Sequence, residues 1–192
     1  MNAMPPPLRL REESALALDG HASIPSVFTA HTVCTVHAAP AGWTLRERPV
    51  AAFSKDYDAF EDPRSWTRDF DTRAWVLLAA YDGPVRAGGA LVAVATPGVD
   101  MLEGRDDLAV LWDLRVAPAW RGRGLAMALV GATQAWARRA GCSELKIETQ
   151  NNNPAACRLY ARAGLRLAVA RPGAYPELPD EVQLIWRMRL AG

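Results

Sequence analysis

The feature that most constrains this chain is an apolar strand that leads through a glycine- and arginine-rich turn directly into an alanine-rich helix. The strand ends at Val116 and the helix begins near Leu125. Between them lie Arg121, Gly122, Arg123 and Gly124. The unpaired N–H groups that open a helix carry about half a positive charge in sum, glycine lets a bulky ligand approach the backbone, and arginine adds forked donors. The stretch predicts a phosphate-binding loop, although a basic turn without a ligand would have the same spacing.

The composition of the chain excludes several kinds of partner. A net charge of +1 over 192 residues, with scattered basic side chains, gives a nucleic acid little to bind. No apolar stretch approaches the ~20 residues that cross a bilayer, and residues 1–7 lack the apolar core of a signal peptide. We therefore expect a cytoplasmic protein with neither a nucleic-acid nor a membrane partner.

Three cysteines, Cys34, Cys142 and Cys157, are present. Their odd number argues against a disulfide framework, and they lack the spacing of metal ligands. We expect reduced thiols and no metal site.

The length of the chain suits one domain, and half of its residues are hydrophobic, which is ample for a core. Residues 1–25 are rich in proline and charge and show little pattern. We therefore assign a single domain to residues 26–192 and treat residues 1–25 as a poorly patterned segment before it.

Apolar and β-branched runs predict strands before the central turn. These runs cover 27–36, 43–47, 74–81 and 85–94, with a hairpin signal at Asp82-Gly83-Pro84 between the last two. Residues 51–71 are polar and compatible with helix. After the central turn come a helix over 125–140, a strand over 144–149, a helix over 154–163 and two strands within 165–190. Hairpins followed by alternating helices and strands predict an α/β fold with a mixed sheet.

Two segments resemble the GCN5-related N-acetyltransferase (GNAT) family. Arg121-x-x-Gly124-x-Ala126, which follows the strand that ends at Val116, is similar to the acyl-CoA-binding motif of that family. The segment from Asn153 to Leu165 resembles its Asn-x-x-Ala-x-x-x-Tyr-x-x-x-Gly-Phe motif, with leucine in place of the phenylalanine. Both segments occur in the order that the family has.

The run from Glu148 to Tyr160 is more specific. It resembles the Glu-Thr-Gln-x-Asn-Asn-x-x-Ala-Cys-x-x-Tyr run of the streptothricin acetyltransferases, a branch that acetylates the β-lysine amine of streptothricin antibiotics. The resemblance implies an α/β GNAT fold, with a central, mixed, largely antiparallel twisted sheet of about seven strands flanked by helices. It also implies acetyl-CoA as acyl donor, no metal, and a small-molecule amine such as a streptothricin-like antibiotic as acceptor.

The resemblance further assigns the contacts with acetyl-CoA to the central strand, the turn and the second helix. The implied contact residues are Leu114, Val116, Arg121, Gly122, Arg123, Gly124, Leu125, Ala126, Asn153, Ala156 and Tyr160. Asn153 also has a complete structural explanation, because an asparagine before Pro154 can cap the helix that follows.

Acetyl transfer to an amine requires a base, since an alkyl ammonium has a pKa of about 10.4. Asp113, on the strand before the turn, is the first candidate, and the streptothricin branch has a glutamate at the similar place. The side chain of Asp113 is shorter than that of the glutamate, which favours a role through water or in substrate binding. Strand alternation places Asp113 on the face opposite the apolar residues of the strand unless a bulge intervenes. Glu148 is the rival base. An ion pair with Arg115 or Lys146 would explain either carboxylate without catalysis.

Two further catalytic roles follow from the resemblance. The backbone N–H of Val116 matches the donor that stabilises negative charge on the thioester oxygen. Tyr160 matches the general acid of the family, and a phenol with a pKa of about 10 can donate to the departing thiolate. A buried tyrosine packed on the sheet is the ordinary alternative.

Five residues are candidates for contact with the acceptor amine. Lys55-Asp56-Tyr57 resembles a Lys-Asp-Tyr run of the streptothricin branch and lies in the most acidic local stretch. Carboxylates at the rim of a cleft attract ammonium groups, whereas a solvated helix face is the plain alternative. Tyr175 and Trp186 match aromatic residues of the same branch. The acceptor contacts are therefore Asp56, Tyr57, Glu148, Tyr175 and Trp186.

Two other functions stay open at this stage. A protein N-terminal or lysine amine would use the same acyl donor but would call for an open groove. A catalytically silent acyl-CoA-binding module would keep Arg121, Gly124 and Ala126 and tolerate loss of the three candidate catalytic residues. The oligomeric state is also open, a homodimer included.

Overall fold

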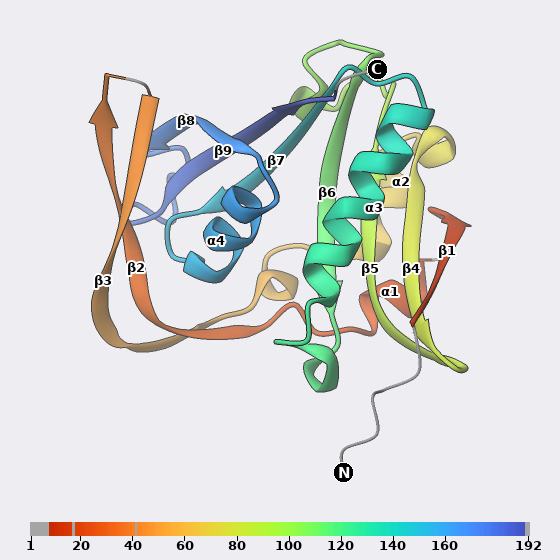
Figure 1. Ribbon diagram of the computed structural model, residues 1–192, viewed down its shortest axis with the longest axis horizontal. Helices are drawn as coiled ribbons and strands as arrows, with labels where there is room; N and C mark the ends of the chain where they lie inside the picture. Colours follow the sequence, from red (N-terminus) through yellow and green to blue (C-terminus); the bar gives the residue numbers. More distant parts are fainter. Residues whose placement is uncertain (1–7, 17, 41, 191–192) are drawn as a thin grey trace.

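The computed structural model describes residues 8–16, 18–40 and 42–190. A seven-stranded sheet forms its centre, in the order β1-β4-β5-β6-β7-β9-β8 (Figure 1). The strands are β1 Arg9–Ser14, β4 Val76–Asp82, β5 Val85–Ala93, β6 Leu108–Val116, β7 Glu144–Gln150, β8 Arg166–Pro172 and β9 Val182–Arg189. Within this sheet of described strands, β6 and β7 alone pair in parallel. The expected mixed, largely antiparallel sheet is confirmed.

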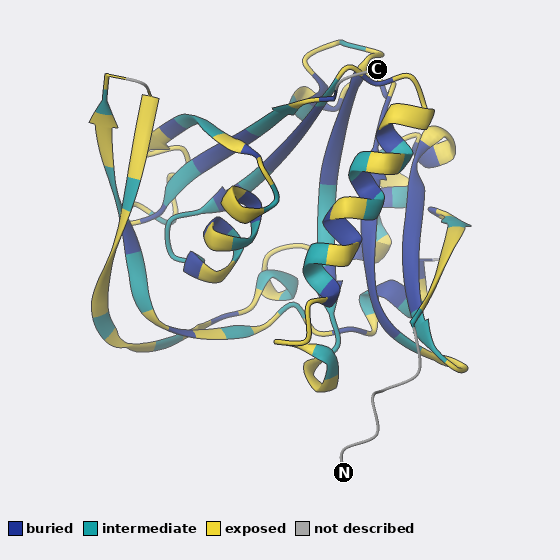
Figure 2. Ribbon diagram, in the orientation of Figure 1, coloured by how far each residue is buried: buried dark blue, intermediate teal, exposed yellow. Residues whose placement is uncertain are grey.

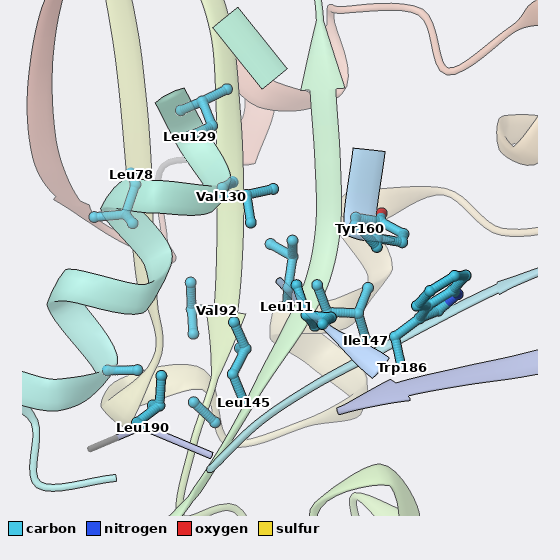
Figure 3. Packing of buried hydrophobic residues seen from close by; sticks show 14 of the residues in the cluster. Leu78, Val92, Leu111, Leu129, Val130, Leu145, Ile147, Tyr160, Trp186 and Leu190 are labelled. Atoms are coloured by element: carbon cyan, nitrogen blue, oxygen red, sulfur yellow. The ribbon is translucent and has the colours of Figure 1, made fainter. Parts of the chain in front are cut away.

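Helices cover both faces of the sheet. The α-helices are α1 Leu18–Ala22, α2 Trp66–Asp69, α3 Leu125–Arg139 and α4 Pro154–Arg162. α3 and α4 pack on one face with one hydrophobic cluster, and α1 and α2 pack on the other with a second cluster. Figure 2 shows α3 and α4 banded with buried and exposed residues, as amphipathic helices are. In Figure 3, Leu129 and Val130 of α3 lie close to Leu78 and Val92 of the sheet. Among the residues that the structure describes, none of the helices combines the length and the apolar composition that a bilayer crossing requires.

β6 contains a bulge that changes the alternation of its side chains. Leu91 of β5 lies opposite Asp113, whereas Val92 lies opposite Leu111, so Trp112 is the extra residue. Because cross-strand partners share a face, Asp113 lies on the α1 and α2 face with Leu91. The two faces of β6 therefore exchange at the bulge, and unbroken alternation along the strand does not hold.

A separate hairpin, β2 (Phe28–Ala39) with β3 (Gly42–Lys55), packs against α4 and β8 at one side of the molecule (Figure 1). Both predicted strands exist, but β3 is much longer than 43–47. Its pairing with β2 continues to the last residue of β3, so the prediction of helix-compatible chain from residue 51 is wrong over its first residues. Cross-strand pairing has overridden a weak local preference.

The remainder of the polar stretch forms short turns rather than a long helix. The 3₁₀ turns among the described residues are η1 Tyr57–Ala59, η2 Pro63–Ser65, η3 Thr72–Ala74, η4 Asp100–Leu102 and η5 Pro118–Trp120. Asp56, Asp62 and Asp71 each accept a hydrogen bond from the backbone N–H two residues on. Such local bonds compete with helix formation and favour turns.

The segment 1–25, in which the sequence shows little pattern, contributes two elements. β1 pairs with β4 along its whole length, and α1 buries Leu18 and His21. β1 is an edge strand of six residues, mostly exposed and rich in charge. Short, charged edge strands carry almost no hydrophobic signal in a sequence.

Candidate functional site

The candidate site lies where β6 and β7 part. Their pairing runs from Leu108↔Glu144 to Leu111↔Ile147 and then stops, although both strands continue. Figure 1 shows them diverging toward the N-terminal end of α3. A cleft of about 880 Å³ is lined by both strands, the start of α3 and α4, which is enough volume for a sizeable small-molecule ligand.

The glycine-rich turn forms one rim of this cleft. Gly122 and Gly124 have φ of +74° and +84°, and a Cβ at either position would meet no atom within 4 Å. Gly124 is the N-cap of α3, and no side chain of the described residues caps this helix. Ala128 N bonds back to Gly124 O at 3.1 Å, which leaves the N–H groups of residues 125–127 available to an anion. Leu125 and Ala126 also line the cleft.

The two arginines of the turn have other contacts. All three guanidinium nitrogens of Arg121 donate to main-chain carbonyls, among them Nε to Val116 O at 3.0 Å. The Arg123 guanidinium carbon lies 5.3 Å from the centroid of the Trp120 ring. The positive end of α3, rather than the Arg121 side chain, is therefore what the turn offers to an anion.

Two backbone N–H groups of β6 face the cleft. Ala117 N donates to Ala87 O at 2.9 Å, and N–H directions alternate along a strand. The N–H groups of Val116 and Leu114 consequently point away from β5, toward the space that β7 has left. Such preorganised donors suit an oxygen atom on which negative charge develops.

Asp113 is held in an ionic network. Its Oδ2 accepts hydrogen bonds from His21 Nε2 at 2.9 Å and from Arg115 Nε at 2.6 Å. Burial raises the pKa of the Asp113 carboxyl, but the hydrogen bond and charge of His21 and the charge of Arg115 outweigh burial, so that this pKa lies below its usual value. A carboxylate with a lowered pKa is a weak base. The ion pair with Arg115, considered from the sequence as the non-catalytic alternative, is present.

Glu148 lines the cleft from β7 in a different environment. Its Oε1 accepts a hydrogen bond from Tyr175 Oη at 2.6 Å, and its Oε2 accepts one from Gln183 Nε2 at 2.9 Å. Lys146, the cation considered for an ion pair, donates to Glu103 Oε1 instead. Glu148 is therefore a cleft carboxylate held in place by neutral donors.

From this carboxylate a chain of hydrogen bonds leads to the start of α4. Gln150 Nε2 donates to Tyr175 Oη at 2.9 Å, and Gln150 Oε1 accepts from Tyr57 Oη at 2.7 Å. Asn153 Nδ2 donates to Tyr57 Oη at 3.4 Å, while Asn153 Oδ1 accepts from Ala156 N at 3.1 Å, which confirms the predicted cap. Burial raises the pKa of Tyr57 to about 12, so this phenol is a neutral donor near neutral pH.

Tyr160 reaches the cleft from α4 and is 6 % exposed. Its hydroxyl has no hydrogen-bond partner among the described residues, and burial raises the pKa of this phenol. Figure 3 shows Trp186 beside Tyr160, with ring centroids 6.2 Å apart. Trp186 is 4 % exposed and belongs to the hydrophobic core. Trp186 was expected to contact the acceptor, but the structure places it in the core beside Tyr160.

The remaining wall of the cleft is aromatic and acidic, and the sequence identified only Tyr57 in it. The other lining residues here are Phe60, Glu61, Trp66 and Trp112. Aromatic residues spaced among the acids of the 51–71 stretch were the available signal in the sequence.

Asp56, which was expected to contact the acceptor, has other partners: its carboxylate accepts a hydrogen bond from Ser26 Oγ at 3.0 Å and caps η1. The neighbouring acid Asp58 pairs with Arg115. Over the described part of the chain, no group of three His, Cys, Asp or Glu side chains could hold a metal ion.

Comparison with known proteins adds a family. The model of the Acetyltransferase (GNAT) family matches residues 41–165. Over 163 residues the chain is 28 % identical to a streptothricin acetyltransferase of Escherichia coli, with 83 % of each chain covered. Over 159 residues it is 30 % identical to a streptothricin acetyltransferase of Streptomyces lavendulae, with 80 % of this chain and 77 % of the relative covered.

A solved structure of a nourseothricin acetyltransferase is also similar in its whole architecture. The TM-score is 0.73 at 27 % identity, and the superposition covers 96 % of this chain and 99 % of that one. The match extends beyond the range of the family model and includes the N-terminal elements on which the cleft depends.

Gly124→Val should weaken the binding of acetyl-CoA, the expected acyl donor, about tenfold or more, because the added methyl groups would stand where a phosphate approaches the helix N-terminus. Isothermal calorimetry measures this directly. Valine at a φ of +84° is strained, so both proteins are compared at a temperature at which circular dichroism shows them folded.

Gly131→Val is the matched control, since Gly131 lies on the exposed side of α3 and a Cβ there meets no atom within 4 Å. Its affinity should equal that of the unaltered protein. An unchanged affinity in Gly124→Val would refute the anion site at this turn.

Proposed function

We propose the following reaction for this chain, which belongs to the acetyltransferase (GNAT) family: the acetyl group of acetyl-CoA passes directly to a primary amine of a small molecule. One observation carries the proposal. The parted strands β6 and β7 open a cleft whose rim is the uncapped start of α3. A thioester between the strands and a pyrophosphate on the helix N-terminus are the two ends of one elongated ligand. The streptothricin acetyltransferases that align with most of the chain support an acceptor of this kind.

Backbone groups provide most of the proposed contacts with acetyl-CoA. The N–H groups of Leu125 and Ala126 bind the pyrophosphate, and Gly122 and Gly124 allow it to come close. Arg123 adds positive charge at the rim. Leu114 on β6, Asn153 at the N-cap of α4 and Ala156 in its first turn contact the remainder of the donor.

Glu148 is the proposed general base. An alkyl ammonium with a pKa of about 10.4 must lose a proton before it attacks, and a carboxylate can take that proton directly or through water. Glu148 faces the cleft between two neutral donors. Asp113, by contrast, is bound to His21 and Arg115, and we assign it a positioning role.

The chemical step then needs one donor for the oxygen and one for the sulfur. The amine nitrogen forms a bond to the thioester carbonyl carbon, the carbon–sulfur bond breaks, and sulfur leaves with the bonding pair. The Val116 N–H stabilises the negative charge that develops on the carbonyl oxygen. The Tyr160 hydroxyl, kept protonated by its raised pKa, donates a hydrogen bond or its proton to the departing thiolate.

A streptothricin-like amine is the proposed acceptor class. The cleft that Glu148 lines also contains the aromatic rings of Tyr57, Phe60 and Trp112 and the carboxylate of Glu61. Aromatic faces and carboxylates both attract an ammonium group. Tyr175 contributes to this site indirectly: its hydroxyl donates a hydrogen bond that fixes the orientation of the Glu148 carboxylate.

Release of coenzyme A, followed by thiol colorimetry, tests the reaction with a panel of amines. We expect rapid, saturable release with streptothricin and none with peptides that carry free N-termini. Release with peptides alone would identify a protein acetyltransferase instead. Tight binding of acetyl-CoA without release for any of the amines would contradict the proposed transfer and favour a silent acyl-CoA-binding module.

Tyr160→Phe should lower kcat about 100-fold, because general acid catalysis contributes on that order, while the Kd for acetyl-CoA stays within about twofold. Steady-state kinetics and calorimetry provide the two values. Tyr81→Phe removes a hydroxyl that binds Glu13, outside the cleft, and should leave kcat unchanged. Equal turnover in Tyr160→Phe and the unaltered protein would eliminate the acid role.

Glu148→Gln and Asp113→Asn separate the two carboxylates. Glu148→Gln should lower kcat/KM at neutral pH about 100-fold. Its residual activity should rise steadily with pH, because only amine already deprotonated in solution can react. Asp113→Asn should mainly lower the free energy of unfolding, by roughly 3 kcal/mol, since it breaks a partly buried ionic network. The reverse pattern, with the pH effect in Asp113→Asn, would exchange the two roles.

A further inference from the structure

Figure 1 shows the chain between α1 and β2 running past the end of β6 on its way to the hairpin of β2 and β3. Residues 25–27 have no regular secondary structure. Pro25, Ser26 and Phe28 nevertheless line the cleft. A segment with no backbone ladder of its own must be held by other groups if it is to form a wall of a binding site.

Arg121 holds this segment from one side. Its Nη1 donates to Val27 O at 2.8 Å and its Nη2 donates to Pro25 O at 2.9 Å. The third nitrogen, Nε, donates to Val116 O at the end of β6. One guanidinium thus joins this segment, β6 and the glycine-rich turn that carries it.

Arg115 holds the same segment from the other side. Its Nη1 donates to Ile24 O at 2.9 Å, and its Nη1 and Nη2 both donate to the Asp58 carboxylate. Asp58 Oδ2 in turn accepts from Ser26 N at 3.3 Å. The segment is therefore fixed at four consecutive residues: two arginines of the donor-binding strand and turn hold residues 24, 25 and 27 directly, and Asp58 holds residue 26.

We infer that Arg121 is a positioning residue for the acceptor amine: it fastens the wall formed by residues 25–28 to the turn that receives acetyl-CoA, and it is not a ligand of the phosphates. The inference rests on the proposed acetyl transfer. A planar guanidinium suits this task, because it presents donors in several fixed directions to several carbonyls at once, whereas an ammonium is a single point of charge.

The two possible roles of Arg121 differ in what lysine can replace. A phosphate ligand needs positive charge, which Arg121→Lys keeps. A clamp needs three directed donors, which Arg121→Lys loses as completely as Arg121→Gln does. The pair of variants therefore distinguishes charge from geometry.

We expect Arg121→Lys and Arg121→Gln each to raise the KM for the amine about tenfold, with kcat and the Kd for acetyl-CoA within about threefold of the unaltered protein. Hydrogen–deuterium exchange at the amides of residues 24–28 should be about tenfold faster in both variants. Arg138→Gln removes the same charge from the exposed last turn of α3 and should alter none of these quantities.

A rise of about tenfold in the Kd for acetyl-CoA in Arg121→Gln that Arg121→Lys reverses, with unchanged exchange at residues 24–28, would overturn the inference and make Arg121 a phosphate ligand. The exchange measurement uses the free protein and needs no turnover. Should no amine support turnover, the proposed function fails, while faster exchange in both Arg121 variants still supports the clamp and unchanged exchange still refutes it.

Discussion

The site depends on the early end of the parallel pairing between β6 and β7. Beyond Leu111 and Ile147 both strands continue without each other, and a polar group left unpaired in a buried place costs roughly 1–3 kcal/mol. A fold can tolerate that cost where a ligand takes the place of the missing strand. The N–H groups of Leu114 and Val116 are the groups that the parting leaves for a ligand, and the bulge at Trp112 turns this half of β6 relative to the first half.

Charged contacts hold the half of β6 that does not pair with β7. Arg115 binds Asp113 on its own strand and Asp58 from the polar stretch, and His21 of α1 completes the group. Buried charges repay their desolvation only when their geometry is good and their remaining donors and acceptors are bound. The distances here, between 2.6 and 3.1 Å, meet the first of these requirements, whereas His21 Nδ1 is buried without a hydrogen-bond partner among the described residues. Elements distant in sequence are thereby joined behind the cleft, which makes α1 part of the site rather than an appendage.

The parts of this structure that the sequence predicted are those whose physics is local. The turn at Gly124 and the cap at Asn153 each depend on a few neighbouring residues, so their residue types are sufficient evidence. The sheet of about seven strands was implied by the resemblance to the GNAT family rather than by local pattern, and β1 was not predicted, because a short charged edge strand has no hydrophobic pattern. Trp186 shows the limit of such reasoning. An aromatic residue in a strand packs equally well into a core or beside a ligand, and the register of β9 against β7 decides which.

The same limit explains why the sequence could not choose between the two carboxylates. Asp113 and Glu148 are both acids on neighbouring strands, and only long-range contacts distinguish them. A hydrogen bond from His21 and the positive charge of Arg115 stabilise the ionised form of Asp113 and weaken it as a base. Around Glu148 the donors are the neutral groups of Tyr175 and Gln183, which orient the carboxylate without neutralising it. On the β6 side of the cleft the carboxyl group is therefore paired with a cation, whereas on the β7 side the Glu148 carboxyl group is held by neutral donors alone.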